Sequence, residues 1–343
     1  MTRLLTEGFE MGDLIGWTNG AISSTYKRSG TYSNNVAAGN NFSNASYSPT
    51  FTTVTEGWIR FGIDVVQGYA STDNCQVQWR KGATVLGSIR FMHNQVAKVY
   101  TSTGSLVATG SIVIPQGIWV LIELHIKIDD AGTIEVKIDG VQDTLLTFSG
   151  DTKPGADTGF DNIQFYGYGS TGGSGTCNIA YDDIAVNDNV GSAPDQTWCG
   201  DGKIMKISPN GTVTNQLTGS DGNTVDNHLL VDEIPSNSDT DYVQGTVVDE
   251  EDLYDMAACG LTDVVIRRVW AESRSKDTVA SGGKIALVTK AAGGSEVAGP
   301  DITLSTSYNT RVMSTEQLLN PVDSAAWEVA DIDAIQAGAR TRL

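Results

Sequence analysis

The carboxylates of this chain are numerous, but their spacing predicts no catalytic pair. A retaining glycosidase holds two carboxyl groups roughly 5 Å apart, and residues spaced by two along one strand face provide such a pair. At that spacing Glu123 is followed by His125, and Glu135 is followed by Lys137. Neither glutamate has an acidic partner on its own strand face, so the sequence predicts no glycoside hydrolase.

Other catalytic patterns are missing as well. The acidic run Asp249–Asp252 (DEED) is typical of a charged, solvated turn rather than of an active site. The chain has no GxSxG nucleophile elbow, and its 3 histidines are few for Ser-His-Asp catalysis. The glycine-rich segment Gly169–Thr176 (GSTGGSGT) lacks the spacing and the lysine of a phosphate-binding loop. We therefore expect that the protein is not an enzyme and uses no cofactor.

Cysteine usage indicates where the protein is made. The four cysteines are Cys75, Cys177, Cys199 and Cys259. They are scattered without a CxxC pair, which favours free thiols over a zinc site or a disulfide framework. The N-terminal sequence MTRLLTEGFE has no charged region followed by an apolar core, so it does not resemble a secretory signal. We expect synthesis in a cytoplasm without export by the usual route.

Net charge excludes two classes of partner. Asp and Glu number 41 against 22 Lys and Arg, which gives a formal net charge of -19. Such a surface repels nucleic-acid phosphates and anionic lipid. No apolar run approaches the roughly 20 residues that are needed to span a bilayer. We therefore expect no nucleic-acid partner and no membrane insertion.

Two runs of alternating apolar residues define the clearest structural element. In Leu121–Ile128 and in Thr133–Asp139, every second residue is isoleucine, leucine or valine. Strand side chains point to opposite faces in turn, so each run has one apolar and one mostly wet face. The turn residues Asp129–Gly132 (DDAG) join the runs into a predicted hairpin on the outside of a β-sandwich. The residues predicted to be buried are Ile122, Leu124, Ile126, Ile128, Ile134, Val136 and Ile138.

Residues 1–190 are predicted to form one all-β domain. Short β-forming runs recur between Gly, Asn, Asp and Pro, which is typical of an antiparallel sandwich. The predicted strands are Arg3–Phe9, Ser46–Thr53, Gly57–Val65, Gln76–Lys81, Val85–Phe91, Ala97–Thr101, Leu106–Thr109, Val120–Ile128, Thr133–Ile138, Asp161–Tyr166 and Ala180–Val186. The first and last of these strands are expected to pair, and the polar segment Asn187–Thr197 is the predicted linker.

Residues 191–343 are predicted to form a smaller, mostly β domain. Its predicted strands are Tyr242–Val248, Thr262–Ser273, Gly283–Lys290 and Asp301–Ser305. The polar stretch 209–241 is long for a loop, so we expect it to wrap the first domain or to contact a neighbouring chain. Near the C-terminus, Trp327–Gly338 predicts a short helix with Asp331 as N-cap and Gly338 as its stop.

The predicted strand Thr262–Ser273 also contains the candidate interface residues. Arg267, Arg268 and Trp270 belong to residue types that are enriched where interfaces carry their energy. We expect the second domain to associate with copies of the chain through them. The alternative is that Trp270 fills the core of its own domain.

Several sequence segments together resemble a known family. They are Glu7–Glu10 (EGFE) with Trp17 after it, Gly57–Val65 (GWIRFGIDV), the hairpin, Gly159–Gly167 (GFDNIQFYG) and Tyr181–Asp188 (YDDIAVND). Their order resembles the concanavalin A-like, laminin-G-like jelly rolls of bacteriophage virion proteins. The segments Ile266–Asp277 and Leu318–Gly338 are similar to the C-terminal half of such proteins. The resemblance implies an all-β fold with a jelly-roll sandwich followed by the smaller domain.

The resemblance also implies ligands. Laminin-G-like modules hold a calcium ion at one rim through aspartates and carbonyl oxygens, and Asp182 with Asp183, or the Asp129–Asp130 turn, are the matching positions. Carbohydrate binding on this fold uses exposed aromatics in rim loops, for which Tyr166 and Tyr168 are the candidates. Buried packing or contact with a neighbouring subunit explains those tyrosines equally well.

Two functions follow from these observations. The first is a structural subunit of a phage particle, in a tail, fibre or head decoration. Such a homo-oligomer would dock on copies of itself and on other virion proteins, and would be made in the host cytoplasm and released by lysis. The alternative is a carbohydrate-binding adhesin or receptor-binding protein on the same fold, with a host-surface glycan as its partner.

Overall fold

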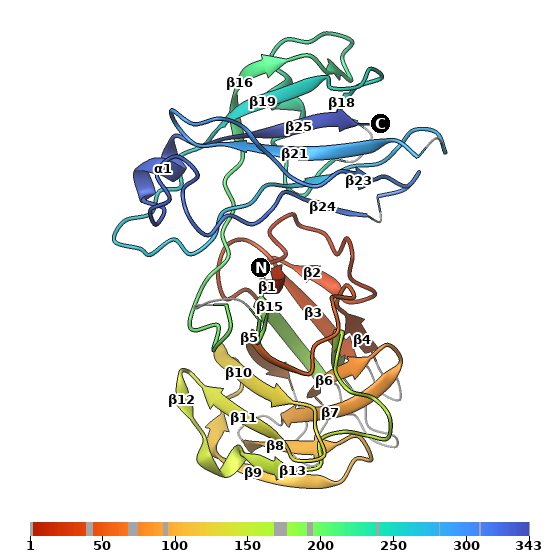
Figure 1. Ribbon diagram of the computed structural model, residues 1–343, viewed down its shortest axis with the longest axis vertical. Helices are drawn as coiled ribbons and strands as arrows, with labels where there is room; N and C mark the ends of the chain where they lie inside the picture. Colours follow the sequence, from red (N-terminus) through yellow and green to blue (C-terminus); the bar gives the residue numbers. More distant parts are fainter. Residues whose placement is uncertain are drawn as a thin grey trace. The chain divides into compact units, whose positions relative to one another are not determined.

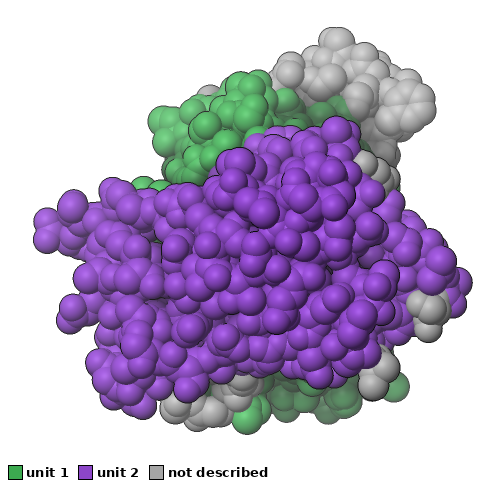
Figure 2. Space-filling view, turned by 90° about the horizontal axis from the view of Figure 1, so that it is seen from above, with its two compact units in different colours: residues 1–10, 17–205 green, residues 11–16, 206–343 purple. Residues whose placement is uncertain are grey.

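The computed structural model describes residues 3–38, 44–67, 75–91, 95–167, 177–190, 195–237, 240–280, 282–308 and 310–342. Their contacts divide the chain into two compact units, which Figure 2 colours separately. Unit 1 comprises residues 1–10 and 17–205, and unit 2 comprises residues 11–16 and 206–343. That residues 1–190 fold by themselves stays a prediction.

The first sheet of unit 1 contains the predicted hairpin (Figure 1). Over the described residues it has nine strands, in the order β12-β11-β10-β5-β15-β3-β2, with β1 paired to β15 and β13 to β11. Their bounds are β1 (Arg3–Glu7), β2 (Ala21–Ser23), β3 (Ser33–Ala38), β5 (Glu56–Gln67), β10 (Val120–Lys127), β11 (Gly132–Ile138), β12 (Val141–Gln142), β13 (Phe148–Gly150) and β15 (Cys177–Asp188). The antiparallel pairing of β1 with β15 confirms that the first and last predicted strands meet.

The second sheet of unit 1 has six strands within the described ranges, in the order β4-β14-β6-β7-β8-β9. Their bounds are β4 (Asn44–Tyr47), β6 (Cys75–Lys81), β7 (Thr84–Phe91), β8 (Gln95–Thr101), β9 (Leu106–Ile114) and β14 (Asn162–Gly167). All of its pairings are antiparallel. The predicted all-β, jelly-roll-like sandwich is therefore confirmed.

The core of unit 1 lies between these two sheets. From the first sheet Phe61 and Tyr181 are fully buried, and from the second Phe165 and Trp79. The rings of Phe165 and Tyr181 approach to 3.9 Å between centroids, so the sheets touch through aromatic side chains. Gly87 on β7 makes room for the indole, since a Cβ there would lie 2.3 Å from the Trp79 ring.

The hairpin has the register that its alternation predicts. Leu124 pairs with Val136, and Ile126 pairs with Ile134. All seven apolar side chains that we expected to be buried are at most 4 % exposed. The assignment of the apolar face is confirmed.

The opposite face of the hairpin is only partly wet, which corrects the expectation of a mostly wet face. Residues 195–205, here called the strap, contact it. The Gly200 N–H donates to Glu123 at 2.7 Å, and the Lys137 ammonium lies 4.1 Å from the centre of the Trp198 ring. Glu123 is only 3 % exposed as a result. Alternation within a strand predicts which side chains share a face, but not whether a later segment covers that face.

A disulfide joins the two sheets, which corrects the prediction of four free thiols. Cys75 on β6 is bonded to Cys177 on β15, 102 residues later in the chain. Cys199 and Cys259 are free. Sequence spacing gave no sign of the bond, because only the packing of one sheet on the other brings the two cysteines together.

Unit 2 is built on a third sheet (Figure 1). In the described part of the chain it has six strands, in the order β16-β19-β25-β21-β22 with β23 paired to β21; β17 pairs with β18 and β20 with β24. The bounds are β16 (Pro209–Asn215), β17 (Thr218–Gly219), β18 (Val243–Gln244), β19 (Glu251–Met256), β20 (Glu272–Arg274), β21 (Lys284–Lys290), β22 (Val297–Ala298), β23 (Ile302–Thr303), β24 (Arg311–Met313) and β25 (Gln336–Arg342). Two 3₁₀ turns, η1 (Thr144–Leu146) and η2 (Asn227–Leu230), and the helix α1 (Val329–Asp333) complete the elements.

The first half of unit 2 contains more regular structure than the sequence indicates. The polar stretch 209–241 contributes β16, β17 and η2, and its contact with the first domain or with a neighbouring chain stays a prediction. The prediction of a solvated turn for the acidic run Asp249–Asp252 is wrong for its second half: Asp249 is exposed in a turn, whereas Glu251 and Asp252 belong to β19 and are buried. Asp252 is completely buried and accepts hydrogen bonds from the backbone of Gln216 and Leu217, the amide of Asn227 and the hydroxyl of Tyr254. A buried carboxylate with several donors organises a loop rather than facing water.

Two further predictions are wrong in the second half. Most of Thr262–Ser273 is irregular, and β20 begins only at Glu272. The helix α1 has Glu328 as its N-cap, with Asp331 at the third helical position of a capping box. Gly338 does not stop that helix but lies inside β25. A Cβ atom at this position would lie 1.9 Å from the Asp252 carbonyl oxygen. Glycine there allows two strand backbones to approach closely.

Candidate ligand-binding face

The second sheet of unit 1 presents a polar face away from the core. Along β6, Cys75, Val77 and Trp79 are buried in the sandwich, whereas Gln76, Gln78 and Arg80 alternate with them. The same alternation on the neighbouring strands places further polar side chains beside them. We call this surface the polar face; its residues are Tyr47, Gln76, Gln78, Arg80, Arg90, Lys98, Tyr100, Gln164 and Tyr166.

Strand register arranges the polar face in rows. One row runs across the sheet through Tyr166, Gln76, Arg90 and Lys98, which are direct cross-strand partners in that order. Directly opposed residues of neighbouring strands have Cβ atoms about 5 Å apart. Amide, guanidinium, ammonium and phenol groups from four strands are thus within reach of a single extended ligand.

A second row positions Arg80. Tyr47, Gln164 and Gln78 are successive cross-strand partners. The Arg80 guanidinium donates to Gln78 Oε1 at 2.7 Å and to Gln164 Oε1, and it lies 5.6 Å from the centre of the Tyr47 ring. These contacts hold the planar guanidinium and both amide groups in one arrangement.

Arg90 is held by an aromatic ring. Its guanidinium carbon lies 3.7 Å from the centre of the Tyr100 ring. No carboxylate pairs with Arg80 or Arg90 among the residues that the structure describes. Arg80 also donates to the backbone carbonyl oxygens of Gly82 and Ala83. Two guanidinium groups are therefore held by neutral partners, and no acid neutralises their positive charge.

The charge of the polar face is opposite to that of the whole chain. The chain has 41 acidic residues and a formal net charge of -19, yet β4, β6, β7, β8, β9 and β14 contain no Asp or Glu. They contain Arg80, Lys81, Arg90 and Lys98. A hollow of about 450 Å³ lies on this face, lined by Gln76, Gln78, Arg80, Val85, Arg90, Gln164 and Tyr166. Such a surface fits an anionic ligand.

The structure brings one of the two predicted carbohydrate residues to this hollow. Tyr166 on β14 is half-buried and lines it. Tyr168 lies outside the described residues. Sequence reasoning missed the amides and arginines, although their regular alternation with Val77 and Trp79 was a signal that could have found them.

The predicted calcium ligands lie in a different place. Asp182 and Asp183 are fully buried at a β-bulge of β15, where Asp183 has a φ of 52°. Protein donors occupy their four oxygens: the backbone N–H groups of Arg28, Ser29, Asp183 and Ile204, the Ser29 hydroxyl and the Arg28 guanidinium. Burial, followed by the charge of Asp183, raises the pKa of Asp182. The described residues contain no cluster of three or more metal-ligating side chains, and calcium binding stays a prediction.

The predicted interface residues do not form a strand surface. Arg267 is exposed, whereas Trp270 is half-buried. Arg268 is largely buried and pairs with Glu316 at 2.9 Å. Their role in an interface stays a prediction. No described helix is long and apolar enough to cross a membrane.

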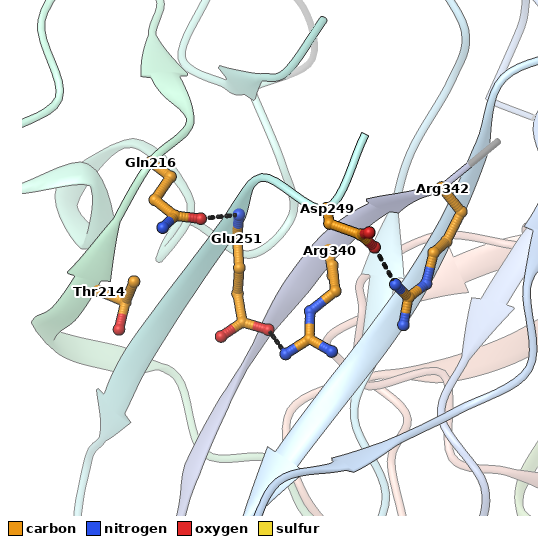
Figure 3. A pocket seen from close by; sticks show the side chains of 6 residues that line it. All are labelled: Thr214, Gln216, Asp249, Glu251, Arg340 and Arg342. Atoms are coloured by element: carbon orange, nitrogen blue, oxygen red, sulfur yellow. Dashed lines mark hydrogen bonds and ion pairs between the residues drawn. The ribbon is translucent and has the colours of Figure 1, made fainter. Parts of the chain in front are cut away.

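A second hollow, of about 390 Å³, lies in unit 2 (Figure 3). Its arginines are already paired with acids. Arg340 contacts Glu251 and Glu296, and Arg342 contacts Asp249 and Asp301. Figure 3 shows that Asp249 and Glu251 each point at one guanidinium. Because acids neutralise both cations, this hollow is a structural ion-pair network and a weaker candidate for a ligand site than the polar face.

Comparisons with known proteins describe fold only. No protein-family model matches the sequence, and a comparison with curated proteins finds no relative. Solved structures do match part of the chain. They include a cellulose induced protein, Cip1 (17 % identity, TM-score 0.42, covering 55 % of this chain and 89 % of that one) and an endo-β-1,4-glucuronan lyase from the fungus Trichoderma reesei (16 %, 0.40, 54 % and 95 %). A third is the carbohydrate recognition domain of Emp47p (11 %, 0.37, 52 % and 94 %).

These matches correct one expectation from the sequence. We predicted that the chain is not an enzyme, and the presence of a polysaccharide lyase among similar structures contradicts that exclusion. The physical reason is that the missing pair of carboxylates is a requirement of glycoside hydrolases and not of every enzyme that cleaves polysaccharides. At these identities and TM-scores, the matches assign no activity to this chain.

Proposed function

We propose that the polar face binds an anionic polysaccharide whose sugars carry carboxylate groups. The observation that carries this proposal is the charge reversal: in a chain of net charge -19, six adjacent strands contain no acid and present Arg80, Arg90 and Lys98. Long-range repulsion from the acidic chain disfavours polyanions in general. A ligand that binds here must therefore gain specific, close contacts on this face.

The chemistry of the side chains fits a uronate. A guanidinium donates two parallel hydrogen bonds to one carboxylate, and a fixed guanidinium loses little freedom on binding. Gln76, Gln78 and Gln164 supply donors and acceptors for sugar hydroxyls. The half-buried Tyr166 adds a ring that packs on sugar C–H groups. The rows span several strands, so they offer contacts to successive sugars of one chain.

The experiment measures binding of the full-length protein to three polymers: a polyuronate, a sulfated glucan and neutral cellulose oligosaccharides. The proposal predicts that the polyuronate binds and that its affinity falls as salt is raised, because exposed charge pairs are screened. Replacement of Arg90 by Gln should weaken binding about tenfold or more, which corresponds to the loss of one charge-assisted hydrogen bond.

The matched control is Arg267→Gln, which removes an exposed arginine of unit 2. It should leave binding unchanged. Circular dichroism and thermal unfolding of both variants would show that the fold is intact. Equal binding of the three polymers, or equal losses for Arg90→Gln and Arg267→Gln, would refute the proposal.

A second candidate function, β-elimination, uses the same face. In one cross-strand row, Arg90 has Gln76 on one side and Lys98 on the other, and Tyr166 follows Gln76. Elimination on a uronate needs a cation or amide that stabilises charge on the carboxylate and groups that move protons. A base removes the proton on carbon 5, the bond from carbon 4 to the leaving oxygen breaks, a double bond forms between carbons 4 and 5, and the leaving oxygen gains a proton.

The elimination product reports its own formation. Its conjugated double bond absorbs ultraviolet light, and the polymer becomes shorter. Rising absorbance with the polyuronate, lost in Tyr166→Phe, would establish a lyase. Binding without any double bond would leave a carbohydrate-binding protein. The phage-subunit role is not favoured by any contact of the described residues; self-association and a virion location stay predictions.

A further inference from the structure

A histidine lies between two carboxylates on the first sheet of unit 1, opposite the core and apart from the polar face. His125 on β10 has Nδ1 2.7 Å from Glu135 Oε2 and Nε2 2.8 Å from Glu56 Oε1. Glu135 is on β11 and Glu56 begins β5, so the three residues connect three adjacent strands. This cluster takes no part in the proposed function.

Both contacts are satisfied by only one form of the ring. A neutral imidazole has a single N–H, so it donates to one carboxylate and turns a lone pair toward the other. The imidazolium donates to both. The second oxygen of Glu135 accepts an amide N–H from Gln142 at 3.1 Å, and the second oxygen of Glu56 accepts one from Asn189 at 3.3 Å.

The same ring supports the strap. It stacks on Trp58 with 4.6 Å between centroids and an angle of 6°, and the ring of Trp198 meets it edge-on at 6.0 Å. Trp198 belongs to the strap, and its ring also lies over the ammonium of Lys137. The π-electrons of the tryptophan rings attract an imidazolium more strongly than they attract a neutral imidazole.

The other charged groups of this region are accounted for by separate contacts. Glu123 accepts from the Gly200 N–H, and Arg60 donates to the carbonyls of Asp183 and Gly200. The remaining charged side chains on β10, β11, β15 and the strap are Lys127, Lys137, Asp182, Asp183, Asp188, Asp195, Asp201 and Lys203. Asp182 is an exception among the acids, because burial and the charge of Asp183 raise its pKa to about 8. It lies near the Ile204 end of the strap, where Asp183 accepts the Ile204 N–H, so exchange is followed at Trp198 and Cys199 instead. Burial raises the pKa of the Cys199 thiol. The other acids and the lysines do not ordinarily change charge between pH 5 and 8, whereas histidine does.

We propose that His125 is a pH-sensitive latch for the strap. Its imidazolium bridges Glu56 and Glu135 beneath Trp198, and loss of one proton as the pH rises breaks one of the two bridges and loosens the Trp198 end. The sign follows from the form that is stabilised: the latch holds where the imidazolium is present and is lost as the pH rises. It also fails in strong acid, where both carboxylates are protonated.

The test follows amide hydrogen exchange of the strap in the full-length protein at pH 6 and pH 8, expressed as protection relative to the intrinsic rate. In the wild type, protection around Trp198 and Cys199 should fall about tenfold between the two values, which corresponds to one charge-assisted hydrogen bond. In His125→Asn, protection should be low at both values. The matched control His228→Asn changes a histidine of unit 2 and should behave as the wild type.

A second variant guards against misfolding of His125→Asn. Glu135→Gln keeps His125 and its stacking on Trp58 but removes one charge, so it should flatten the difference between pH 6 and pH 8. The chain has only 3 histidines, and proton NMR resolves their titrations. Unchanged wild-type protection, an unaltered pH difference in Glu135→Gln, or a His125 resonance that does not titrate between pH 5 and 8 would each overturn the latch.

Discussion

The charge that a side chain of this protein presents to a ligand depends on its partners as well as on its residue type. Arg80 and Arg90 are held by glutamines and tyrosine rings and keep their charge, whereas Arg340 and Arg342 are neutralised by acids. The difference decides which hollow is suited to an anion. The numbers of acidic and basic residues give the net charge of the chain, but only the contacts show where a positive charge is not neutralised by an acid.

Asp143 shows the same principle for a carboxylate. Its Oδ2 accepts the backbone N–H groups of Ser111 at 2.6 Å and Ile112 at 3.0 Å, and its Oδ1 accepts the Ser111 hydroxyl at 2.9 Å. It also caps η1 through the Leu145 N–H. Burial alone would raise the pKa of Asp143, but these hydrogen bonds outweigh it and lower that pKa.

We predict that Asp143→Asn lowers the free energy of unfolding at pH 7 by about 1–3 kcal/mol, because buried donors lose a charged acceptor. A carboxyl whose folded-state pKa is depressed stabilises the fold above its unfolded pKa, and this contribution disappears as the pH falls through the folded value. The difference between wild type and variant should therefore shrink in acid. Urea unfolding at pH 7 and below pH 4 measures it, with exposed Asp151→Asn as control. A gap that stays constant with pH would contradict this account.

At the scale of elements, the hairpin β10–β11 is the part that local sequence specifies best. Its turn and its alternation fix both the register and the face that meets the core. The strap shows the opposite case. Its residues were part of a predicted linker and the segment after it, yet Gly200 and Trp198 cover the outer face of the hairpin.

We predict that Leu124→Ala destabilises the protein by about 2–5 kcal/mol, through lost burial and the cavity that remains. Leu124 is fully buried and pairs with Val136. Val141→Ala is the control, since that side chain is 61 % exposed on β12 of the same sheet, and it should change stability by less than about 0.5 kcal/mol. Chemical denaturation measures both. Equal effects would mean that the hairpin does not pack as described.

At the scale of the whole molecule, two units of different construction follow each other in one chain. Unit 1 is a sandwich whose two sheets are joined by aromatic packing and by the Cys75–Cys177 bond. Unit 2 is organised around buried polar contacts such as those of Asp252, and around many ion pairs. A disulfide persists in an oxidising environment, so the bond also bears on where the protein works.

We predict that the denatured protein, unfolded without reductant, contains two reactive thiols and not four. Replacement of both Cys75 and Cys177 by Ala should lower stability by about 2–5 kcal/mol, because the bond closes a long loop in the unfolded chain. Thiol titration and thermal unfolding measure these outcomes. Cys259→Ala, which removes a free thiol of unit 2, is the control. Four reactive thiols in the wild type would show that the bond does not form.

The sequence by itself determined the features that depend on near neighbours. Alternation predicted the all-β fold, the buried residues of the hairpin and the pairing of the chain's first and last sandwich strands, because the period of a strand is local. It failed for Thr262–Ser273 and for the buried half of the acidic run, whose conformations depend on distant partners such as Glu316 and Asn227.

Only the tertiary structure decided the candidate sites. The polar face needs Gln76, Arg90, Lys98 and Tyr166 side by side, and their strands are brought together by sheet pairing. The disulfide joins residues that are 102 positions apart. The physical reason is the same in each case: side-chain chemistry acts over a few ångströms, and the contacts that create those distances are not encoded by spacing along the chain.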